Sequence, residues 1–446
     1  MSTVRLPPGP ALPRAVQGAF AVAAPLRGVR ILRNRHGDAF TVNVPIFGRA
    51  VVISSPAEIK QLFTARAEDV GNLERNLGRV LGPGSLFALS GEEHRKQRRL
   101  LVPPFHGRRL AAYERIVEEE TVRELADWPR GRAFPTLPSM MRITLNVILR
   151  AVFGAEGAQL HRLRALLPPF VRLGSWLAVA PVPALGGGRW TPWGRFRQLR
   201  RDYDTIVDQL IAKAEREDLD ARDDILALLL QARHDDGTQL SRADIADHLL
   251  TLLTAGHETT ATTLAWAVER LRRHPAVLDR LIEEVDTGGS EFRQATITEV
   301  QRTRPVIDLV GRQILTDGYQ LGRWRLPKGY SVLVSISLIH EDESLFSNAS
   351  AFDPSRFLDT KPDLYQWIPF GGGTRRCLGA AFANMEMHVV LRTMLWHFTL
   401  APTGERGERW HSRGVAGAPG NGGRVIVHRR TPADAPHRAT APGARA

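Results

Sequence analysis

The feature that most constrains the fold is a long helical pattern that begins at Ser241 and stops before Pro275. Ser241 can cap this helix, and Asp244, three residues on, can bond back to it. Apolar residues then recur close to a 3.6-residue period at Ile245, Leu249, Leu252, Leu253, Leu264 and Ala267. At about 1.5 Å per residue, a helix over 242–274 is roughly 50 Å long, about the width of the whole molecule. We therefore expect a mainly helical fold whose core is crossed by this helix.

Shorter signals surround that helix. Residues 41–44 and 50–53 predict a small hairpin, and strand signals return at 319–326 and 331–334. Between 56 and 273 the pattern is mostly helical, with breaks expected at 82–84, 103–104, 168–169 and 186–188. The stretch from Leu173 to Gly188 contains prolines and a glycine run, and it predicts an apolar loop that could contact a membrane surface.

A polar interruption stands in the apolar centre of the long helix, with the sequence Ala-Gly-His-Glu-Thr-Thr at 255–260. Burying a carboxylate costs free energy unless it is paired or hydrogen-bonded, so an acid at this position needs an explanation. In one interpretation the helix is locally loosened and offers Glu258 and Thr259 to a ligand, while Gly256 lets a flat molecule approach. In the other, His257 and Glu258 face a solvated edge and Thr259 bonds back to a helix carbonyl. The segment alone leaves both open.

The single cysteine, Cys377, excludes disulfides within the chain and zinc sites that need two thiolates. It lies in the glycine-rich sequence Phe-Gly-Gly-Gly-Thr-Arg-Arg-Cys-Leu-Gly over 370–379, just before a helical run over 380–397. Backbone amides, Arg375, Arg376 and the start of that helix would all stabilise a thiolate. The loop contains no histidine base for nucleophilic catalysis, so it favours a thiolate that binds iron.

These residues resemble the cytochrome P450 family. Phe370, Gly373, Arg375, Cys377 and Gly379 match its haem-binding signature, which is highly specific. Three further landmarks follow the family's order over roughly 7–429: 255–260 resembles the oxygen-activating segment, Glu299–Arg302 the Glu-x-x-Arg pair, and 352–357 the Pro-x-Arg-Phe element, with Ser355 where an acid is common.

The resemblance implies a mainly α fold with minor β, built as one large unit over 1–430 with a long central helix and small β-sheets. The Ala/Pro/Arg-rich tail over 431–446 is expected to be disordered. The implied cofactor is haem b (iron protoporphyrin IX), with Cys377 as the iron ligand. Haem contacts are expected from Phe370, Gly371, Arg375, Gly379, His94, Arg98, Arg312 and Ala255. Proton supply is expected from Thr259 and Glu258, and a buried network from Glu299, Arg302 and Arg356.

The implied activity is hydroxylation of an apolar small molecule, fatty acyl, terpenoid or steroid-like, with O2 and with electrons from a ferredoxin and its reductase. Phe87, Phe170, Trp176, Leu252, Val306 and Ile307 are candidates for the substrate pocket or, equally, for plain core. A haem-based oxygen sensor or carrier without turnover is the alternative, and an isomerase or peroxygenase of the same fold is a third reading.

Charge and targeting signals complete the expectations. The net charge is +13, yet the arginines are scattered among acidic residues and form no long basic run. We therefore interpret most of them as solvated helix faces, with an acidic protein partner as the second interpretation and nucleic acid as a distant third. No secretory signal is recognised, and no apolar run approaches the 20 or so residues of a spanning helix. We expect a cytoplasmic monomer with at most peripheral membrane contact.

Overall fold

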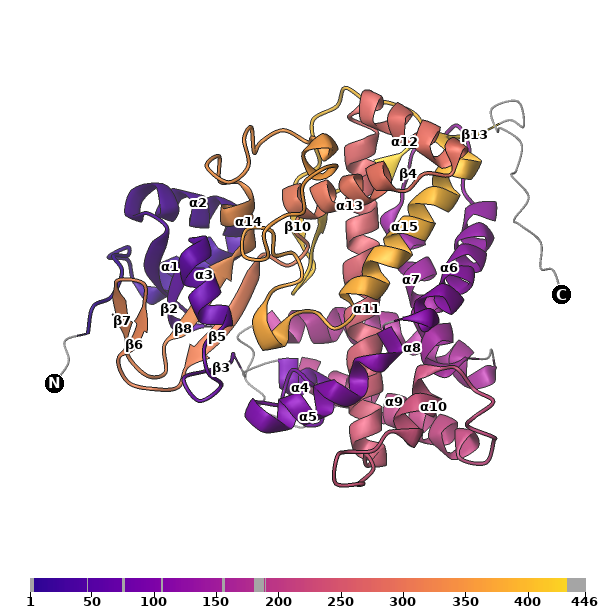
Figure 1. Ribbon diagram of the computed structural model, residues 1–446, viewed down its shortest axis with the longest axis horizontal. Coiled ribbons are helices and arrows are strands. Elements are labelled where there is room, and N and C mark those ends of the chain that lie inside the picture. The colour runs from indigo at the N-terminus through magenta and orange to yellow at the C-terminus, as the bar shows by residue number, and fades with distance from the viewer. Residues whose placement is uncertain are drawn as a thin grey trace.

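The computed structural model describes residues 4–45, 47–73, 77–105, 107–154, 157–179, 188 and 190–430. Helices dominate this part of the chain, as predicted, and the largest sheet lies at one side of them (Figure 1). The helices are α1 (Arg14–Ala23), α2 (Pro25–His36), α3 (Pro56–Phe63), α4 (Leu77–Leu81), α5 (Gly91–Leu101), α6 (Arg108–Ala126), α7 (Leu137–Phe153), α8 (Ala158–Val179), α9 (Pro192–Ala214), α10 (Ile225–Gln231), α11 (Arg242–Leu271), α12 (Pro275–Thr287), α13 (Glu291–Thr303), α14 (Ile336–His340) and α15 (Ala380–His397).

The strands form one five-stranded sheet and several two-stranded pairs. The larger sheet has the order β1-β2-β8-β5-β3, in which only β2 and β8 run parallel. The predicted hairpin is present as β1 with β2, and the predicted strand signals at 319–326 and 331–334 correspond to the β6–β7 pair and to β8. The strands are β1 (Ala39–Val44), β2 (Gly48–Ile53), β3 (Val70–Asn72), β4 (Phe134–Pro135), β5 (Leu309–Ile314), β6 (Tyr319–Leu321), β7 (Trp324–Leu326), β8 (Ser331–Ser335), β9 (Phe398–Leu400), β10 (Trp410–Ser412), β11 (Gly417–Pro419), β12 (Arg424–Val425) and β13 (Val427–Arg429).

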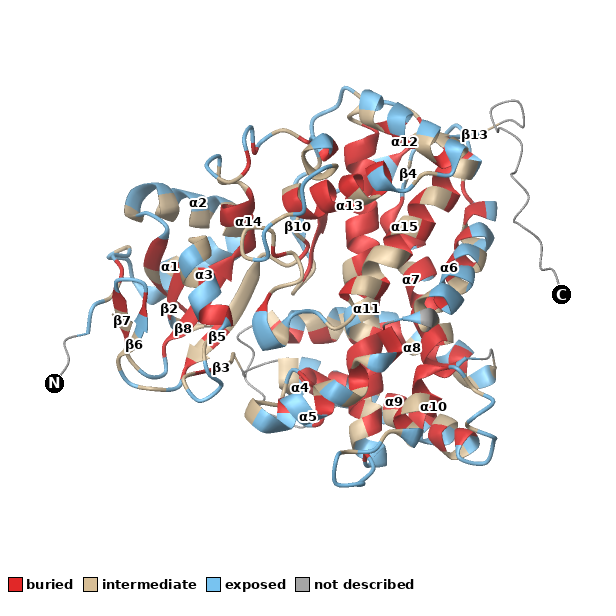
Figure 2. Cartoon of the chain, viewed as in Figure 1, coloured by how far each residue is buried: buried red, intermediate tan, exposed pale blue. Residues whose placement is uncertain are grey.

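Helix α11 is the long helix predicted from the sequence, and it is buried along most of its length (Figure 2). The Ser241 hydroxyl accepts a hydrogen bond from the Asp244 amide at 3.1 Å and donates to the Asp244 carboxylate at 2.6 Å. All six apolar positions of the predicted period are buried. The helix ends at Leu271, three residues before the predicted end, and Pro275 opens α12 instead. At 30 residues it spans about 45 Å.

Helix α8 contradicts the predicted break at Pro168 and Pro169, because it runs unbroken through both prolines to Val179. A proline inside a helix costs about 3 kcal/mol, so the surrounding packing has to offset it. Phe170 is fully buried and its ring lies 4.7 Å from that of Phe196 on α9. Residues 173–179 are therefore helix rather than the apolar loop we expected, and 180–187 lie outside the described residues.

Two other expectations meet the limits of the described chain. The tail over 431–446, expected to be disordered, lies outside it. Within the described residues, no helix is both long and apolar enough to cross a bilayer.

Candidate functional site

The cysteine loop is a tight turn that ends at the start of α15. The Cys377 amide donates to the Phe370 carbonyl at 2.9 Å, which closes the loop, and the Gly379 amide donates to the thiol sulfur. Helix α15 begins at Ala380, three residues after the cysteine, as predicted. Its positive end therefore lies close to the sulfur.

Glycine is required at the centre of this loop because α3 packs directly against it. A Cβ atom on Gly373 would lie 2.2 Å from the Phe63 backbone oxygen, and one on Gly372 would lie 2.2 Å from the Phe63 ring. Gly373 also has a φ of +66°, which disfavours any other residue. The glycines thus serve the close approach of α3 to the loop.

The Cys377 side chain is accessible to solvent on one side, while the protein around it still excludes most water. That burial raises the pKa of the thiol, and the Gly379 amide, Arg98 and Arg376 oppose the shift without cancelling it. Arg376 thus acts on the thiol in the direction that we expected. Arg375 instead donates to the backbone oxygens of Leu86, at 2.7 Å, and Leu89. A thiolate at this position therefore needs a bound cation to stabilise it, and an iron ion bound to the sulfur would supply that charge.

The four basic residues predicted to bind the haem carboxylates lie close together, although they come from three separate parts of the chain. Burial lowers the pKa of His94 to about 4, and Arg375, Arg98 and Arg312 lower it further. Burial, together with Arg375, lowers the pKa of Arg312 to about 10. Helix α5, strand β5 and the cysteine loop therefore place positive charge around one point.

This cluster fits the two propionate groups of haem. The charges that shift the pKa of His94 and Arg312 are all positive, and both side chains are buried. Burying several positive charges is unfavourable unless anions pair with them. Guanidinium groups bind carboxylates through two parallel hydrogen bonds. Arg98 lies near Cys377 as well as Arg376, so the same group of side chains joins the cysteine to the basic cluster. Cys377 would hold the iron, and His94, Arg98, Arg312 and Arg375 would hold the carboxylates.

One stripe of α11 is accessible in the middle of an otherwise buried helix. Ala255 is exposed and Gly256 and Thr259 are half-buried, at the i, i+1 and i+4 spacing of one face. A flat cofactor can lie against this stripe. Gly256 does not serve that approach as we expected, because a Cβ atom there would point to Ile148 of α7, at an ordinary contact of 3.4 Å. The helix is also unbroken here rather than loosened.

Each of the two interpretations of residues 255–260 agrees with only some of the polar side chains. Thr259 donates to the Ala255 carbonyl at 2.8 Å, the bond expected if the threonine were merely structural. Glu258 and His257, however, are buried rather than at a solvated edge. The His257 Nδ1 lies 3.1 Å from the Thr144 hydroxyl of α7, and burial lowers the pKa of His257 to about 4.

Glu258 has a partner that the sequence did not indicate. The Arg413 Nε donates to its carboxylate at 2.9 Å from the loop between β10 and β11. Burial raises the pKa of Glu258, and the ion pair with Arg413 works in the opposite direction. The buried acid is therefore compensated by an arginine 155 positions away in the chain.

The three residues of the predicted structural network lie together, with Glu299 and Arg302 buried and Arg356 half-buried. Arg302 donates to both carboxylate oxygens of Glu299 at 2.7 Å, and Arg356 Nε lies 3.4 Å from the same carboxylate. Arg302 also donates to three backbone oxygens, that of His340 at the end of α14 and those of Ala349 and Ala351 in the segment after it, at 2.7–2.9 Å. The pair thus fastens an irregular segment to α13. Ser355, where an acid is common in the family, leaves the Arg356 contact in place.

His340 is a residue of this site that sequence reasoning missed. Its Nε2 accepts from the Ile368 amide at 3.1 Å, so its Nδ1 carries the proton and donates to the Arg302 carbonyl, also at 3.1 Å. Ile368 stands two residues before the cysteine loop. The ring therefore joins the buried network to the loop, and full burial lowers its pKa to about 3, which keeps it neutral. A lone histidine before an acidic run gave no signal of this.

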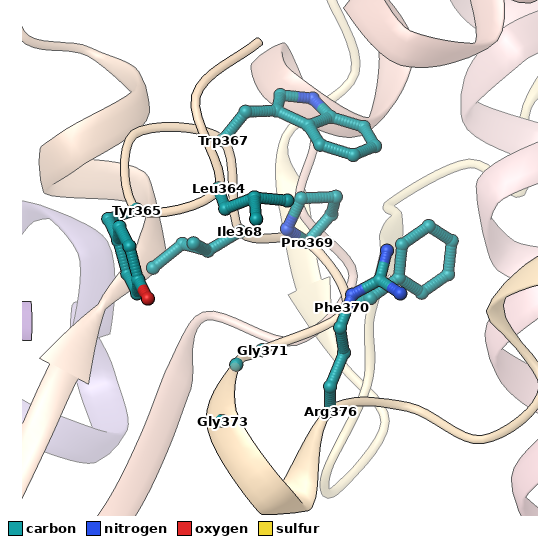
Figure 3. Close-up of a pocket in the computed structure, with 10 residues that line it drawn as sticks. Leu364, Tyr365, Trp367, Ile368, Pro369, Phe370, Gly371, Gly373 and Arg376 are labelled. Carbon is teal, nitrogen blue, oxygen red and sulfur yellow. The ribbon is translucent and has the colours of Figure 1, made fainter. Parts of the chain in front are cut away.

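A small cavity of about 80 Å³ lies beside the cysteine loop. Figure 3 shows the rings of Tyr365 and Phe370 on opposite sides of it, and the exposed Arg376 also lines it. The Trp367 and Phe370 rings pack edge to face at 6.1 Å. The loop thus presents aromatic surface and one cation next to the cysteine.

The candidate pocket residues separate by burial. Phe170 is fully buried against α9 and belongs to the core, and Leu252 and Val306 are also buried. Phe87 and Trp176 are exposed, and Ile307 is half-buried. Sequence alone could not separate these groups.

Comparison with known sequences gives matches over nearly the whole chain. The family profile described as cytochrome P450 matches residues 7–417. The protein designated cytochrome P450 138 of Mycobacterium tuberculosis is 56% identical over 429 residues, which cover 96% of this chain and 97% of that protein. The protein designated cytochrome P450 135B1 of the same species is 38% identical over 454 residues, covering 99% and 96%.

Solved structures match the fold. The retinoic-acid-bound cyanobacterial CYP120A1 superposes with a TM-score of 0.84 at 24% identity, covering 96% of this chain and all of that one. The cytochrome P450DA heme domain gives a TM-score of 0.85 at 21% identity, covering 98% and 100%. At these identities the likeness establishes the shared fold.

Proposed function

The chain belongs to the cytochrome P450 family of haem-thiolate monooxygenases, and on that premise we propose that it hydroxylates an apolar small molecule. The observation that carries the proposal is the group of basic side chains beside Cys377, in which His94 and Arg312 are buried and Arg98 and Arg375 are half-buried. It provides one thiol for iron and a set of cations for two carboxylates. The family's cofactor, iron protoporphyrin IX, supplies the activation of O2 when it is bound.

The protein's own contribution is to hold, orient and protonate. Cys377 would hold the iron in the loop that contains Phe370, Gly371 and Gly379, and Ala255 would offer a flat surface on α11. Thr259 and Glu258 supply protons on the side of the accessible stripe. Thr259 now donates to the Ala255 carbonyl. Its hydroxyl would turn from this carbonyl to hold a water molecule at the accessible stripe.

The substrate proposal rests on two buried apolar residues, Leu252 of α11 and Val306, which follows α13. Leu252 lies one turn before Ala255, and Val306 bonds through its carbonyl to the Gly417 amide of β11 at 2.8 Å. Apolar surface of this kind favours a fatty acyl, terpenoid or steroid-like compound. The sequence expectations of a cytoplasmic monomer built as one unit over 1–430 stay predictions.

Electrons would come from an acidic ferredoxin and its reductase. The exposed Arg376 lines the cavity beside the cysteine loop, where a negatively charged partner would dock close to the sulfur. Attraction between unlike charges speeds such encounters and weakens as salt rises. Reduction of the iron by a ferredoxin should therefore slow with ionic strength, and a rate that ignores salt would contradict this docking site.

Two experiments test the proposal. The reduced protein with carbon monoxide should show the thiolate-ligand absorption band, and Cys377→Ala should abolish it; retention of the band in that variant would refute the ligand assignment. A panel of fatty acids, terpenoids and steroids is then screened for spectral shifts and products. With a compound that the protein oxidises, the Thr259→Ala variant should form less product per reductant consumed than the unmodified protein does. An oxygen sensor or carrier would bind oxygen without consuming reductant at all.

A further inference from the structure

The hairpin formed by β10 and β11 is firmly attached to the helical core at its base. The Trp266 indole of α11 donates to the Gly417 carbonyl at 2.9 Å, and the Gly417 amide donates to the Val306 carbonyl at 2.8 Å. Trp410 and Pro419 pair across the two strands. The base of the hairpin is therefore fixed relative to α11.

The tip of the hairpin, residues 412–416, contacts both α8 and the acid of α11. The Val415 amide donates to the Ser175 hydroxyl of α8 at 2.9 Å. Gly414 lies so close to α8 that a Cβ atom would meet the Ser175 backbone at 2.6 Å. Between these contacts and the strands, Arg413 reaches the Glu258 carboxylate at 2.9 Å.

The two partners differ in their access to water. The Glu258 side chain is 8% exposed, whereas that of Arg413 is 34% exposed. On the α7 side, Thr144 and His257 bond to one another and are both buried. Among the described residues, Arg413 is the charged group that acts on Glu258, and neutral His257 is the titratable neighbour on its own helix. The hairpin tip is thus the side on which Glu258 meets a partly solvated group.

We propose that Arg413 is a positioning residue for proton supply: it holds the Glu258 carboxylate at the hairpin tip, where this acid takes up protons from solvent and passes them toward Thr259. Each proton that Glu258 takes up from solvent leaves again toward Thr259, so the ion pair is unchanged after each transfer and no electron moves at it. This inference rests on the proposed role of Glu258 in hydroxylation. It assigns a role to a hairpin residue outside α11.

The matched variants are Arg413→Gln, Arg413→Lys and Arg409→Gln, all studied in the haem-loaded protein. Lysine keeps the charge at the tip. Arg409 is exposed at the base of the same hairpin, so its replacement changes the net charge equally without touching Glu258. Infrared titration of the Glu258 carboxyl band, assigned by its loss in Glu258→Gln, reports the acid directly. Removing Arg413 should move this titration to higher pH, Arg413→Lys should restore most of the shift, and Arg409→Gln should leave it unchanged.

Oxygen uptake with ferredoxin, reductase and NADPH provides the second measurement. Arg413→Gln should lower proton-dependent turnover by about tenfold, below the 10²–10⁴-fold that a positioned acid supplies, and should shift its pH profile in the same direction. An unchanged Glu258 titration in Arg413→Gln would overturn the inference. Unchanged uptake in Glu258→Gln would instead refute the proton role of Glu258 while leaving the position of Arg413 standing.

Discussion

Replacing Arg302 by methionine tests whether the buried network supports the cysteine loop. The substitution leaves the fully buried Glu299 carboxylate with the Asp353 amide at 2.9 Å and Arg356 at 3.4 Å. It also removes the donors to three backbone oxygens, one at the end of α14 and two in the segment after it. Breaking a buried ion pair on one side costs about 3–5 kcal/mol. At about 2.1 cal/mol/K per residue over 446 residues, this lowers the unfolding midpoint by about 3–5 °C.

The matched control is an exposed pair with the same spacing. Glu92 and Arg95 are three residues apart on α5 with a contact of 2.7 Å, and their side chains are 60% and 55% exposed. Arg95→Met should cost less than about 1 kcal/mol, because water screens the pair. Urea unfolding measures both variants. The carbon monoxide spectrum of the reduced protein then reports the thiolate-ligated fraction, which should fall only in Arg302→Met. Equal losses of stability in the two variants would refute the reasoning.

Three more predictions follow from the same contacts. Burial lowers the pKa of His248 and His257 to about 4 and that of His340 to about 3, so the unfolded chain binds their protons first as pH falls. The free energy of unfolding should drop between pH 6.5 and 4 by up to about 1.4 kcal/mol per pH unit for each histidine. Urea unfolding at pH 7 and 5 measures this drop, and His257→Gln should make the free energy of unfolding depend less steeply on pH. Gly373→Ala should displace the cysteine loop, because its Cβ meets a backbone oxygen at 2.2 Å, and lower haem retention; full retention would contradict the steric argument. Arg376→Gln should slow reduction by an acidic ferredoxin at low salt and flatten its salt dependence, and an unchanged rate would count against docking at the loop.

The sequence predicted the features that depend on near neighbours. Ser241 and Asp244 bond to each other as the cap of α11, and α15 occupies the predicted residues 380–397. The glycine-rich sequence around Cys377 also predicted the cysteine loop, because its residues are neighbours in the chain. Pro168 and Pro169 show where local rules fail, because burial of Phe170 against α9 outweighs the loss of helix hydrogen bonds.

Only the tertiary structure decided which charged residues are buried and which distant residues they pair with. The Glu-x-x-Arg spacing occurs at 92–95 on an exposed face and at 299–302 in the core, and the spacing itself is the same in both. Arg413 reaches Glu258 across 155 positions, and His340 reaches Ile368 across 28. Capping, periodicity and glycine conformations act over a few residues and can be read from the chain. The energy of a charge depends on how much water the whole fold removes from around it, and that is known only once distant segments have packed.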